Sequence, residues 1–267
     1  MSEIDYYSLP EIYKYRSDGS HPKVPERFLR GLKYDKKVGE KRWKKTLKWR
    51  KKMKIDELVK DQSGNYVTRS KILSTPHTFF KTIKKHYPSY IHNKAKNGSP
   101  VVIEKFGEIN IKKLHEANIT SELIIWHYLY CYEWQWNHLT PSESLKNLSI
   151  YDVKGLTLKG IFLDNALGVV KKLTKYFAAH YIERAYKVFI INVSSKFLTI
   201  WNMIQPFIPV ENRGKIVLLG EQDSYPELLE EIDADKLPIE YGGSDYTPLG
   251  MSDDEIKLSR FVKGNEK

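Results

Sequence analysis

The chain has 267 residues, 41% of them hydrophobic and 29% charged, which suffices for one sizeable core or for a core domain with a small helical annex. It contains no run of about 18 apolar residues, and the segment Met1 to Pro10 lacks the basic start and apolar middle of a secretory signal, so we expect a cytosolic protein without a membrane span. The single cysteine, Cys131, excludes an internal disulfide and is expected to be a small core residue rather than a nucleophile.

The formal net charge of +11 is concentrated in one segment. Residues 30–54 hold thirteen Lys or Arg side chains and only two acids, Asp35 and Glu40, so the remainder of the chain is balanced. The basicity is therefore a local patch on one predicted helix. Such a patch suits an anionic surface, either an acidic membrane or a nucleic acid, and it is also compatible with a merely solvated helix face.

The first part of the chain, residues 1–69, is predicted to be a small helical module. Prolines and glycines interrupt its beginning, no strand-like run is found up to residue 60, and a helix is predicted from Lys36. On that helix Trp43 and Leu47 are four residues apart and share one face, with basic residues around the rest. A turn is predicted at residues 62–65.

The second part, residues 70–245, alternates short runs rich in β-branched residues with stretches of helical periodicity. This alternation predicts an α/β fold with a largely parallel sheet. The predicted strands are residues 101–103, 149–153, 188–191 and 216–219, and the predicted helices are residues 121–139 and 163–181. The remaining residues, 246–267, are expected to form a polar and loosely held tail.

Residues 196–208 are predicted to form a helix that is apolar on nearly every side. At about 13 residues it is too short to cross a bilayer. It is therefore either a helix buried in the core or a lid over an apolar pocket that also contacts a membrane surface. The apolar residues that would act in such a lid are Phe197, Trp201, Ile204, Phe207 and Ile208.

Several short motifs then occur in a recognisable order, and together they cover residues 26 to 245. The motifs are Phe28-Leu29-Arg30-Gly31-Leu32-Lys33-Tyr34-Asp35, Trp49-Arg50, Ile150-Tyr151-Asp152-Val153-Lys154-Gly155, Tyr181-Ile182-Glu183-Arg184, Ile190-Ile191-Asn192 and Leu237-Pro238-Ile239-Glu240-Tyr241-Gly242-Gly243. In this order and spacing the chain resembles the CRAL-TRIO family, in particular the secretory-pathway phosphatidylinositol/phosphatidylcholine transfer proteins.

The resemblance implies a fold in which a small all-α module precedes an α/β domain. There, a mostly parallel sheet floors an apolar pocket, and a gate helix, matched by residues 196–208, closes it. It also implies a function: binding of one phospholipid, in the first place phosphatidylinositol with phosphatidylcholine as a second cargo, and its transfer between membranes without catalysis or a cofactor. We expect a monomer that meets an anionic membrane, of the Golgi or endosomes, only transiently.

The resemblance further implies which residues bind the lipid head group. Glu183 matches the glutamate of the family's Tyr-Pro-Glu-Arg motif, Lys215 matches the lysine after the gate, and with Lys33 these positions serve the inositol phosphate. The chemistry fits, because lysines neutralise a phosphodiester and a carboxylate accepts hydrogen bonds from inositol hydroxyls. Asn212 stands where a hydroxyl residue often helps. A structural salt bridge is the alternative role of Glu183 and Lys215.

A second set of positions is matched to phosphatidylcholine. Thr157 and Lys159 stand where two hydroxyl residues bind the phosphate of that lipid in dual-ligand members, and Lys159 departs from the pattern. Tyr128 matches a pocket tyrosine, with ordinary core packing as its alternative role. Two further departures are Leu32, in place of a basic residue, and Ile182, in place of the proline before the family's glutamate.

Other functional classes find less support. The chain has no Gly-x-Ser-x-Gly motif, the Walker-like spacing from Gly155 to Gly160 is followed by Ile161, and its eight histidines are dispersed, so we expect neither an enzyme nor a metal site. A nucleic-acid adaptor built on the basic segment leaves the apolar helix unexplained. A retinoid, tocopherol or sterol cargo would leave Glu183 and Lys215 without partners unless they pair with each other.

Overall fold

The computed structural model describes residues 24–265 with the exception of residues 32, 34, 65, 140–145, 159–165 and 223. Its centre is a five-stranded sheet in the order β3–β4–β5–β6–β7, in which β3 is antiparallel to β4 and the other neighbours are parallel. The α/β class and the four predicted strands are confirmed. The strands are β3 (Ser89–Lys94), β4 (Pro100–Lys105), β5 (Asn147–Asp152), β6 (Ala185–Val193) and β7 (Ile216–Gly220).

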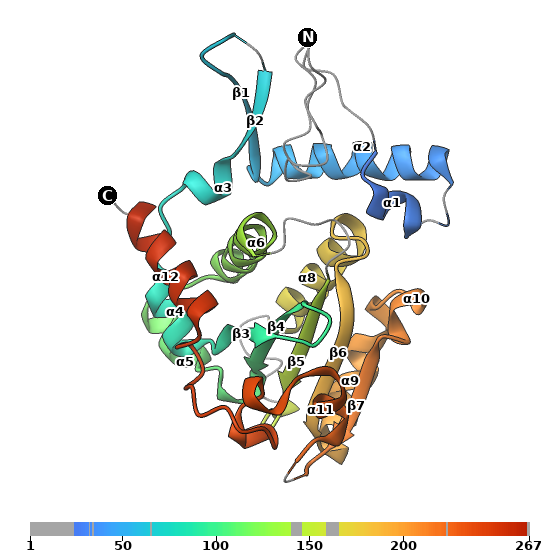
Figure 1. Cartoon of the computed structure of the whole chain (residues 1–267), viewed down its shortest axis with the longest axis vertical. Helices are drawn as coiled ribbons and strands as arrows, with labels where there is room; N and C mark the ends of the chain where they lie inside the picture. Colours follow the sequence, from blue (N-terminus) through green and yellow to red (C-terminus); the bar gives the residue numbers. More distant parts are fainter. Residues whose placement is uncertain are drawn as a thin grey trace.

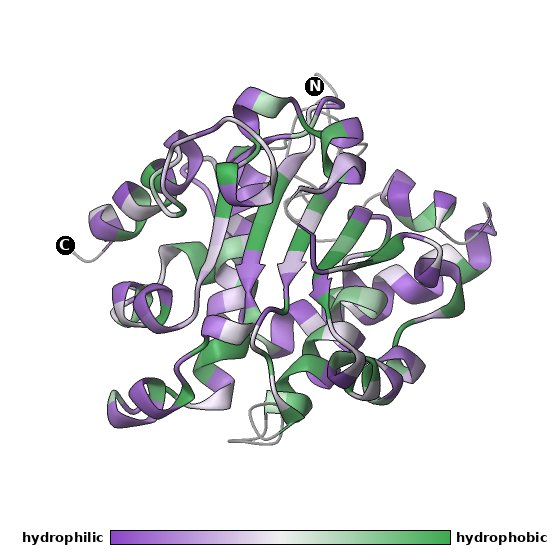
Figure 2. Ribbon diagram, turned by 90° about the horizontal axis from the view of Figure 1, so that it is seen from below, coloured by the Kyte–Doolittle hydropathy of each residue, from purple (hydrophilic) through white to green (hydrophobic). Residues whose placement is uncertain are grey.

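The two faces of the sheet carry different side chains because successive residues of a strand point to opposite faces. Along β5, Leu148 and Ile150 are fully buried against a core that includes α11 (Pro226–Glu231). Ser149 and Tyr151 point to the other face. Figure 2 shows hydrophobic residues, in green, along the central strands, with helices on both sides.

Two long helices lie on the second face, α6 (Ser121–His138) and α8 (Ala166–His180), and both predicted helices are thereby confirmed (Figure 1). The shorter helices α4 (Phe80–His86) and α5 (Ile111–Glu116) join the same core. Cys131 packs against this core, and burial raises the pKa of its thiol to about 12, so the thiol is protonated at neutral pH.

The basic segment contains two helices, α1 (Glu26–Arg30) and α2 (Lys36–Lys52). Asp35 caps the start of helix α2, because its side chain accepts a hydrogen bond of 3.0 Å from the backbone of Val38. The predicted apolar face of α2 is buried against α1, with Trp43 and Phe28 ring centroids 5.1 Å apart. The lysines of α2 are thereby left on its outer side, and Figure 1 shows the helix lying across one end of the molecule.

The expectation that the first 60 residues contain no strand is wrong. Residues Asp56–Lys60 form β1, which pairs antiparallel with β2 (Tyr66–Ser70), and the predicted turn joins the two strands into a hairpin. Gly64 in this turn has a φ of +79°, which glycine adopts without strain. The sequence does not predict this strand because three of its five residues are charged, in Asp56-Glu57-Leu58-Val59-Lys60. The short helix α3 (Lys71–Ser74) follows the hairpin.

A buried ionic group fixes the hairpin and α2 to the rest of the molecule. The guanidinium of Arg50 donates two hydrogen bonds to Glu133 on α6, of 2.8 and 2.9 Å, and also contacts Asp56 on β1 at 2.5 Å. Tyr181 donates to the same glutamate at 2.5 Å. The packing of the N-terminal elements is therefore continuous with the α/β core, and a division into domains near residue 70 stays a prediction.

The expectation of a loosely held C-terminal tail is also wrong. Residues Asp253–Asn265 form α12, which packs on β3 and buries Leu258 and Val262. Glu255 accepts a hydrogen bond from the backbone of Ile91 and forms a buried ion pair with Lys84 at 2.8 Å. The segment reads as polar because only one side of this helix is apolar, and the three acids of its first turn suit a helix N-terminus.

Candidate functional site

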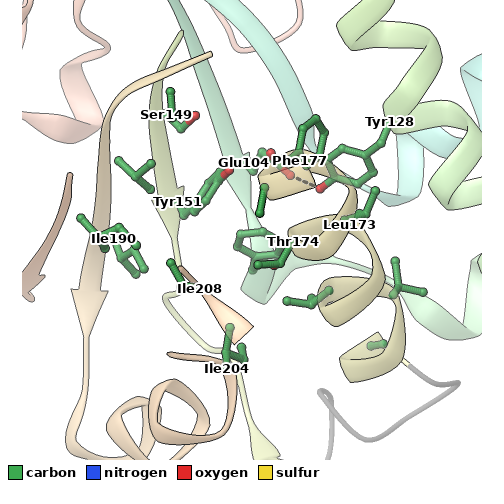
Figure 3. A pocket seen from close by; sticks show the side chains of 18 of the residues that line it. Glu104, Tyr128, Ser149, Tyr151, Leu173, Thr174, Phe177, Ile190, Ile204 and Ile208 are labelled. Carbon is green, nitrogen blue, oxygen red and sulfur yellow. Dashed lines mark hydrogen bonds between the residues drawn. The ribbon is translucent and has the colours of Figure 1, made fainter. Parts of the chain in front are cut away.

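A cavity of about 550 Å³ lies between the sheet and α8, and the segment after β6 closes it on a further side. This volume is in the range of small-molecule binding sites, about 300 to 1,000 Å³. The wall is mainly apolar, as expected for the region beneath residues 197–208. Figure 3 shows the facing side chains, which are Leu173 and Phe177 from α8, Ile190 from β6, and Ile204 and Ile208 from the segment after β6.

The predicted gate segment consists of two helices joined end to end. Helix α9 covers Ser195–Ile204, and the short 3₁₀ helix η4 covers Gln205–Phe207. Ser194 caps α9 by accepting a hydrogen bond of 3.2 Å from the backbone of Phe197. Pro206 cannot donate the N–H that a continuing α-helix needs, which explains why the regular helix stops at this point.

This gate segment has three sides with different surroundings. One side packs on β6 and β7, a second side lines the cavity, and a third is exposed to solvent. The side on the sheet agrees with the core-helix alternative drawn from the sequence, and the role of a lid stays a prediction. The residues are Phe197 and Ile200 against the sheet, Trp201, Ile204 and Ile208 at the cavity, and Leu198 and Phe207, 44% and 45% exposed, in solvent.

Charged side chains gather where three parallel strands begin. Lys146 precedes β5, Glu183 stands two residues before β6, and Lys215 precedes β7. Neighbouring parallel strands start at the same edge of a sheet, so the three residues meet. One carboxylate oxygen of Glu183 lies 2.5 Å from Lys146 Nζ, and the other lies 3.4 Å from Lys215 Nζ. We call these three residues the charged edge cluster; Glu183 and Lys215 also line the cavity.

The conformation of Glu183 is unusual and is held by its neighbours. Its φ of +60° lies in the region that side chains other than glycine disfavour, and such residues concentrate at functional sites. Gly31, at the end of α1, lies directly against this turn. Burial by itself would raise the pKa of Glu183, but the hydrogen bond from Lys146 and the charge of Lys215 outweigh it and lower the pKa. The carboxyl group is therefore ionised at neutral pH.

A second polar group lines the cavity around the buried carboxyl of Glu104 on β4. This carboxyl accepts a hydrogen bond from the hydroxyl of Tyr128 on α6, drawn as a dashed line in Figure 3, and the hydroxyls of Tyr128 and Tyr87 are 2.6 Å apart. Burial raises the pKa of Glu104 to about 7, although the hydrogen bond from Tyr128 opposes the rise. The aromatic rings that line the cavity with it are Tyr87, Phe106, Tyr128, Tyr132, Tyr151 and Phe177.

This second group, which we call the aromatic carboxyl site, has a definite chemistry. Aromatic faces attract cations, and they do so best for a quaternary ammonium, which has no hydrogen-bond donors to satisfy. A cation bound beside Glu104 would also favour the ionised form of the carboxyl group. Aromatic rings beside a carboxyl group are thus the chemistry that suits a quaternary ammonium such as choline.

The other predicted site residues take different places. Asn212 and Thr157 line the cavity, whereas Lys33 is exposed and is not part of the cavity wall. Lys159 lies outside the described residues. Tyr128 belongs to the aromatic carboxyl site. The head-group roles of all these residues stay predictions.

Sequence reasoning missed Lys146 and Glu104. Glu104 had a signal, because it follows Val101-Val102-Ile103 on the face that Val102 shares. Lys146 had none, since it lies three residues before the predicted strand 149–153 and directly precedes β5 only in the structure. Sequence reasoning also left open whether Glu183 and Lys215 pair with each other, and they do. Because Glu183 and Lys215 are partners of each other, a neutral cargo would not leave them as unpaired charges, and that argument against a neutral cargo no longer holds.

Within the described ranges, no helix combines the length and the apolar character that crossing a membrane requires. In the same ranges, no three His, Cys, Asp or Glu side chains are grouped as a metal site would need.

Comparison with known proteins agrees with this geometry. The family profile described as CRAL/TRIO domain matches residues 84–243. Similar curated proteins include the phosphatidylinositol/phosphatidylcholine transfer protein SFH7 of Arabidopsis thaliana, 31% identical over 88% of this chain and 41% of that protein. The SEC14 cytosolic factor of Yarrowia lipolytica is 29% identical over 95% of this chain and 49% of that protein, and the Sec14 cytosolic factor of Schizosaccharomyces pombe is 29% identical over 84% and 75%.

The chain thus spans less than half the length of the first two of these relatives. Among solved structures, Sfh5 superposes with a TM-score of 0.59 at 14% identity, covering 91% of this chain and 80% of the other. At this identity the superposition supports the fold alone.

Proposed function

Since the chain belongs to the CRAL/TRIO domain family, we propose that it binds one phospholipid in the cavity and carries it between membranes, without a catalytic step. The observation that supports this most directly is the apolar cavity, which has the gate segment on one side and two polar groups in its wall. The relatives whose names state phosphatidylinositol/phosphatidylcholine transfer point to the same cargo class.

The physical need for such a cavity follows from the cargo. The two chains of a phospholipid hold about 30 methylenes, and at about 0.8 kcal/mol each their exposure to water costs on the order of 25 kcal/mol. A carrier must replace the membrane interior with an apolar chamber that can open and close. The gate segment fits the role of the moving part because one of its sides meets the chamber and another meets solvent.

We propose that phosphatidylinositol places its head at the charged edge cluster. Lys215 would bind the phosphodiester, and Glu183, which is ionised, would accept hydrogen bonds from inositol hydroxyls. Phosphatidylcholine, as the second cargo, would place its choline in the aromatic carboxyl site, with Thr157 at the cavity wall available to its phosphate.

Contact with the membrane would be made by two surfaces. The outer side of α2 presents lysines that attract an anionic leaflet, and the exposed apolar residues of the gate segment suit its interface. We propose a cytoplasmic monomer that meets membranes only transiently. The exposed lysines of α2 are Lys36, Lys37, Lys41, Lys44, Lys45, Lys48, Lys51 and Lys52.

Identification of the lipid that co-purifies with the protein tests the proposal. Mass spectrometry of an organic extract should find phosphatidylinositol, phosphatidylcholine or both at about one per protein chain. A retinoid, a tocopherol or a sterol would instead show that the same fold carries a neutral cargo.

Transfer between liposomes tests the residue assignment. Lys215→Ala and Glu183→Ala should each lower phosphatidylinositol transfer by about tenfold, because each removes one charge-assisted contact worth about 1.4 kcal/mol, and both variants should stay folded. Transfer equal to the parent in both variants would show that the head group binds elsewhere.

A further inference from the structure

We infer that Lys146, which lies behind the cavity wall, is a positioning residue for Glu183, and that it makes the head-group site prefer anionic phospholipids over zwitterionic ones. The inference rests on the proposed function and adds the specificity of the site. Of the two lysines in the charged edge cluster, Lys146 makes the shorter contact with Glu183, 2.5 Å against 3.4 Å for Lys215.

The charge of the cluster depends on Lys146. Lys215 and Glu183 alone would neutralise each other, and the site would have no net attraction for a phosphate. With Lys146 the cluster carries one net positive charge, which matches the single negative charge of a phosphatidylinositol head. A phosphatidylcholine head has no net charge, and with its choline in the aromatic carboxyl site it gains little from the charge of this cluster.

The charged edge cluster is shielded from solvent enough for its net charge to affect lipid binding. The three side chains are between 23% and 27% exposed, so water screens their interactions only in part. The other acidic and arginine side chains in the cavity wall are Arg42, Glu104, Arg184 and Glu211. The guanidinium of Arg184 lies 4.3 Å from the centre of the Trp136 ring.

The geometry divides the work between the two lysines. The backbone N–H of Asn147 donates a 2.8 Å hydrogen bond to the carbonyl of Arg184, so the neighbours of Lys146 and Glu183 are fixed to each other. Lys146 therefore acts as the positioning residue, because it holds one carboxylate oxygen, and its hydrogen bond helps to lower the pKa of Glu183 against the effect of burial. Lys215, at the longer distance, is the lysine that can turn to the phosphate.

The experiment compares phosphatidylinositol and phosphatidylcholine transfer between liposomes for the parent and three variants. Lys146→Met removes the charge and keeps the aliphatic length, and Lys146→Arg restores the charge. Lys154→Met is the matched control: Lys154 lies just beyond the other end of the same strand, pairs with Glu221 at 2.9 Å and is 68% exposed. Unfolding midpoints are measured for all of them.

The expected result is a loss of about tenfold in phosphatidylinositol transfer for Lys146→Met, which corresponds to about 1.4 kcal/mol, because Glu183 loses its nearer partner and the cluster loses its net positive charge. Phosphatidylcholine transfer should stay at the parental rate, Lys146→Arg should recover most of the loss, and Lys154→Met should change neither rate. Equal loss of both lipids, or unchanged phosphatidylinositol transfer, would overturn the inference. A parent protein that transfers neither lipid would instead overturn the proposed function.

Discussion

The side chain of Glu104 links the stability of the fold to pH. Burial raises its pKa to about 7, against 4.5 for an ordinary glutamate. Between these two values the folded carboxyl keeps a proton that the unfolded chain has lost, so the free energy of unfolding falls as the pH rises through this window. The loss can reach about 3 kcal/mol above pH 7.

Replacing Glu104 by Gln should remove this loss, because the amide oxygen still accepts from Tyr128 but carries no charge. We expect the free energy of unfolding of Glu104→Gln to rise relative to the parent by up to about 3 kcal/mol between about pH 5 and pH 8, as measured by urea denaturation. Two curves that run parallel across that range would show that Glu104 keeps its charge in the fold.

Gly31 leaves room for the turn that holds Glu183. A Cβ atom at this position would lie 2.4 Å from Ile182 Cγ2, which is attached too close to the backbone to move away easily. Gly31→Ala should therefore lower the free energy of unfolding by about 1 to 3 kcal/mol. Phosphatidylinositol transfer should also fall, since the strain displaces Glu183.

Gly264→Ala is the matched control for Gly31→Ala. Gly264 lies in α12, and a Cβ atom there meets nothing within 4 Å, so alanine should leave stability unchanged or raise it by up to about 1 kcal/mol. If both substitutions change the free energy of unfolding equally, as measured by chemical denaturation, the close contact between Gly31 and the turn at Ile182 and Glu183 does not limit stability.

Among the elements, the gate segment joins the cavity to solvent. Trp201 lies partly exposed on its cavity side. Trp201→Asp places a charge where an apolar ring would enter a membrane interface, so the fraction that sediments with liposomes should fall by about tenfold. Lys196→Asp is the control, because it introduces the same aspartate at the start of the same helix but away from the cavity wall. On neutral liposomes it should lower the sedimenting fraction less than Trp201→Asp does. Sedimentation of Trp201→Asp equal to the parent would show that Trp201 does not enter the membrane.

Whether an element could be predicted depends on whether its sequence shows a clear apolar pattern. Each of the strands β4 to β7 contains a short run rich in apolar residues, which marks it in the sequence. By contrast, β3 contains His92 and Asn93 and has a register irregularity, so it has no such run. The helix α12 has apolar residues on one side only. Because that side is buried against β3, which the sequence did not predict, the helix could not be predicted either.

The site was predictable only in part for a different reason. Glu183 and Lys215 are recognised because each stands in a motif of the family. Lys146 stands in none, and it reaches Glu183 only because β5 and β6 are neighbours in the sheet. Strand order and register are properties of the folded sheet, so periodicity along the chain does not show that these charges meet.

At the scale of the whole molecule, the basic end and the gate should act together on membranes. Each lysine near an anionic surface contributes about 1 kcal/mol, so changing Lys41, Lys44, Lys48 and Lys52 to Gln should reduce binding to phosphatidylserine vesicles by more than about tenfold. Binding to neutral vesicles should not change. A quartet of exposed lysines elsewhere, Lys81, Lys85, Lys112 and Lys113, is the control.

Two results would contradict this prediction. One is an equal loss for both lysine sets, which would mean that only total charge matters. The other is binding of the parent to nucleic acid that is stronger than its binding to vesicles at the same salt concentration.

The alternation of side chains along β5 and β6 bears on how such a carrier could acquire new cargo. Leu148, Ile150, Phe189 and Ile191 hold the sheet to α11, while their immediate neighbours Ser149, Tyr151, Val188 and Ile190 line the chamber. Selection in the laboratory could randomise the second set and leave the first untouched. Cargo specificity can thus change at residues directly beside those that stabilise the sheet, while every variant keeps the residues it needs to fold.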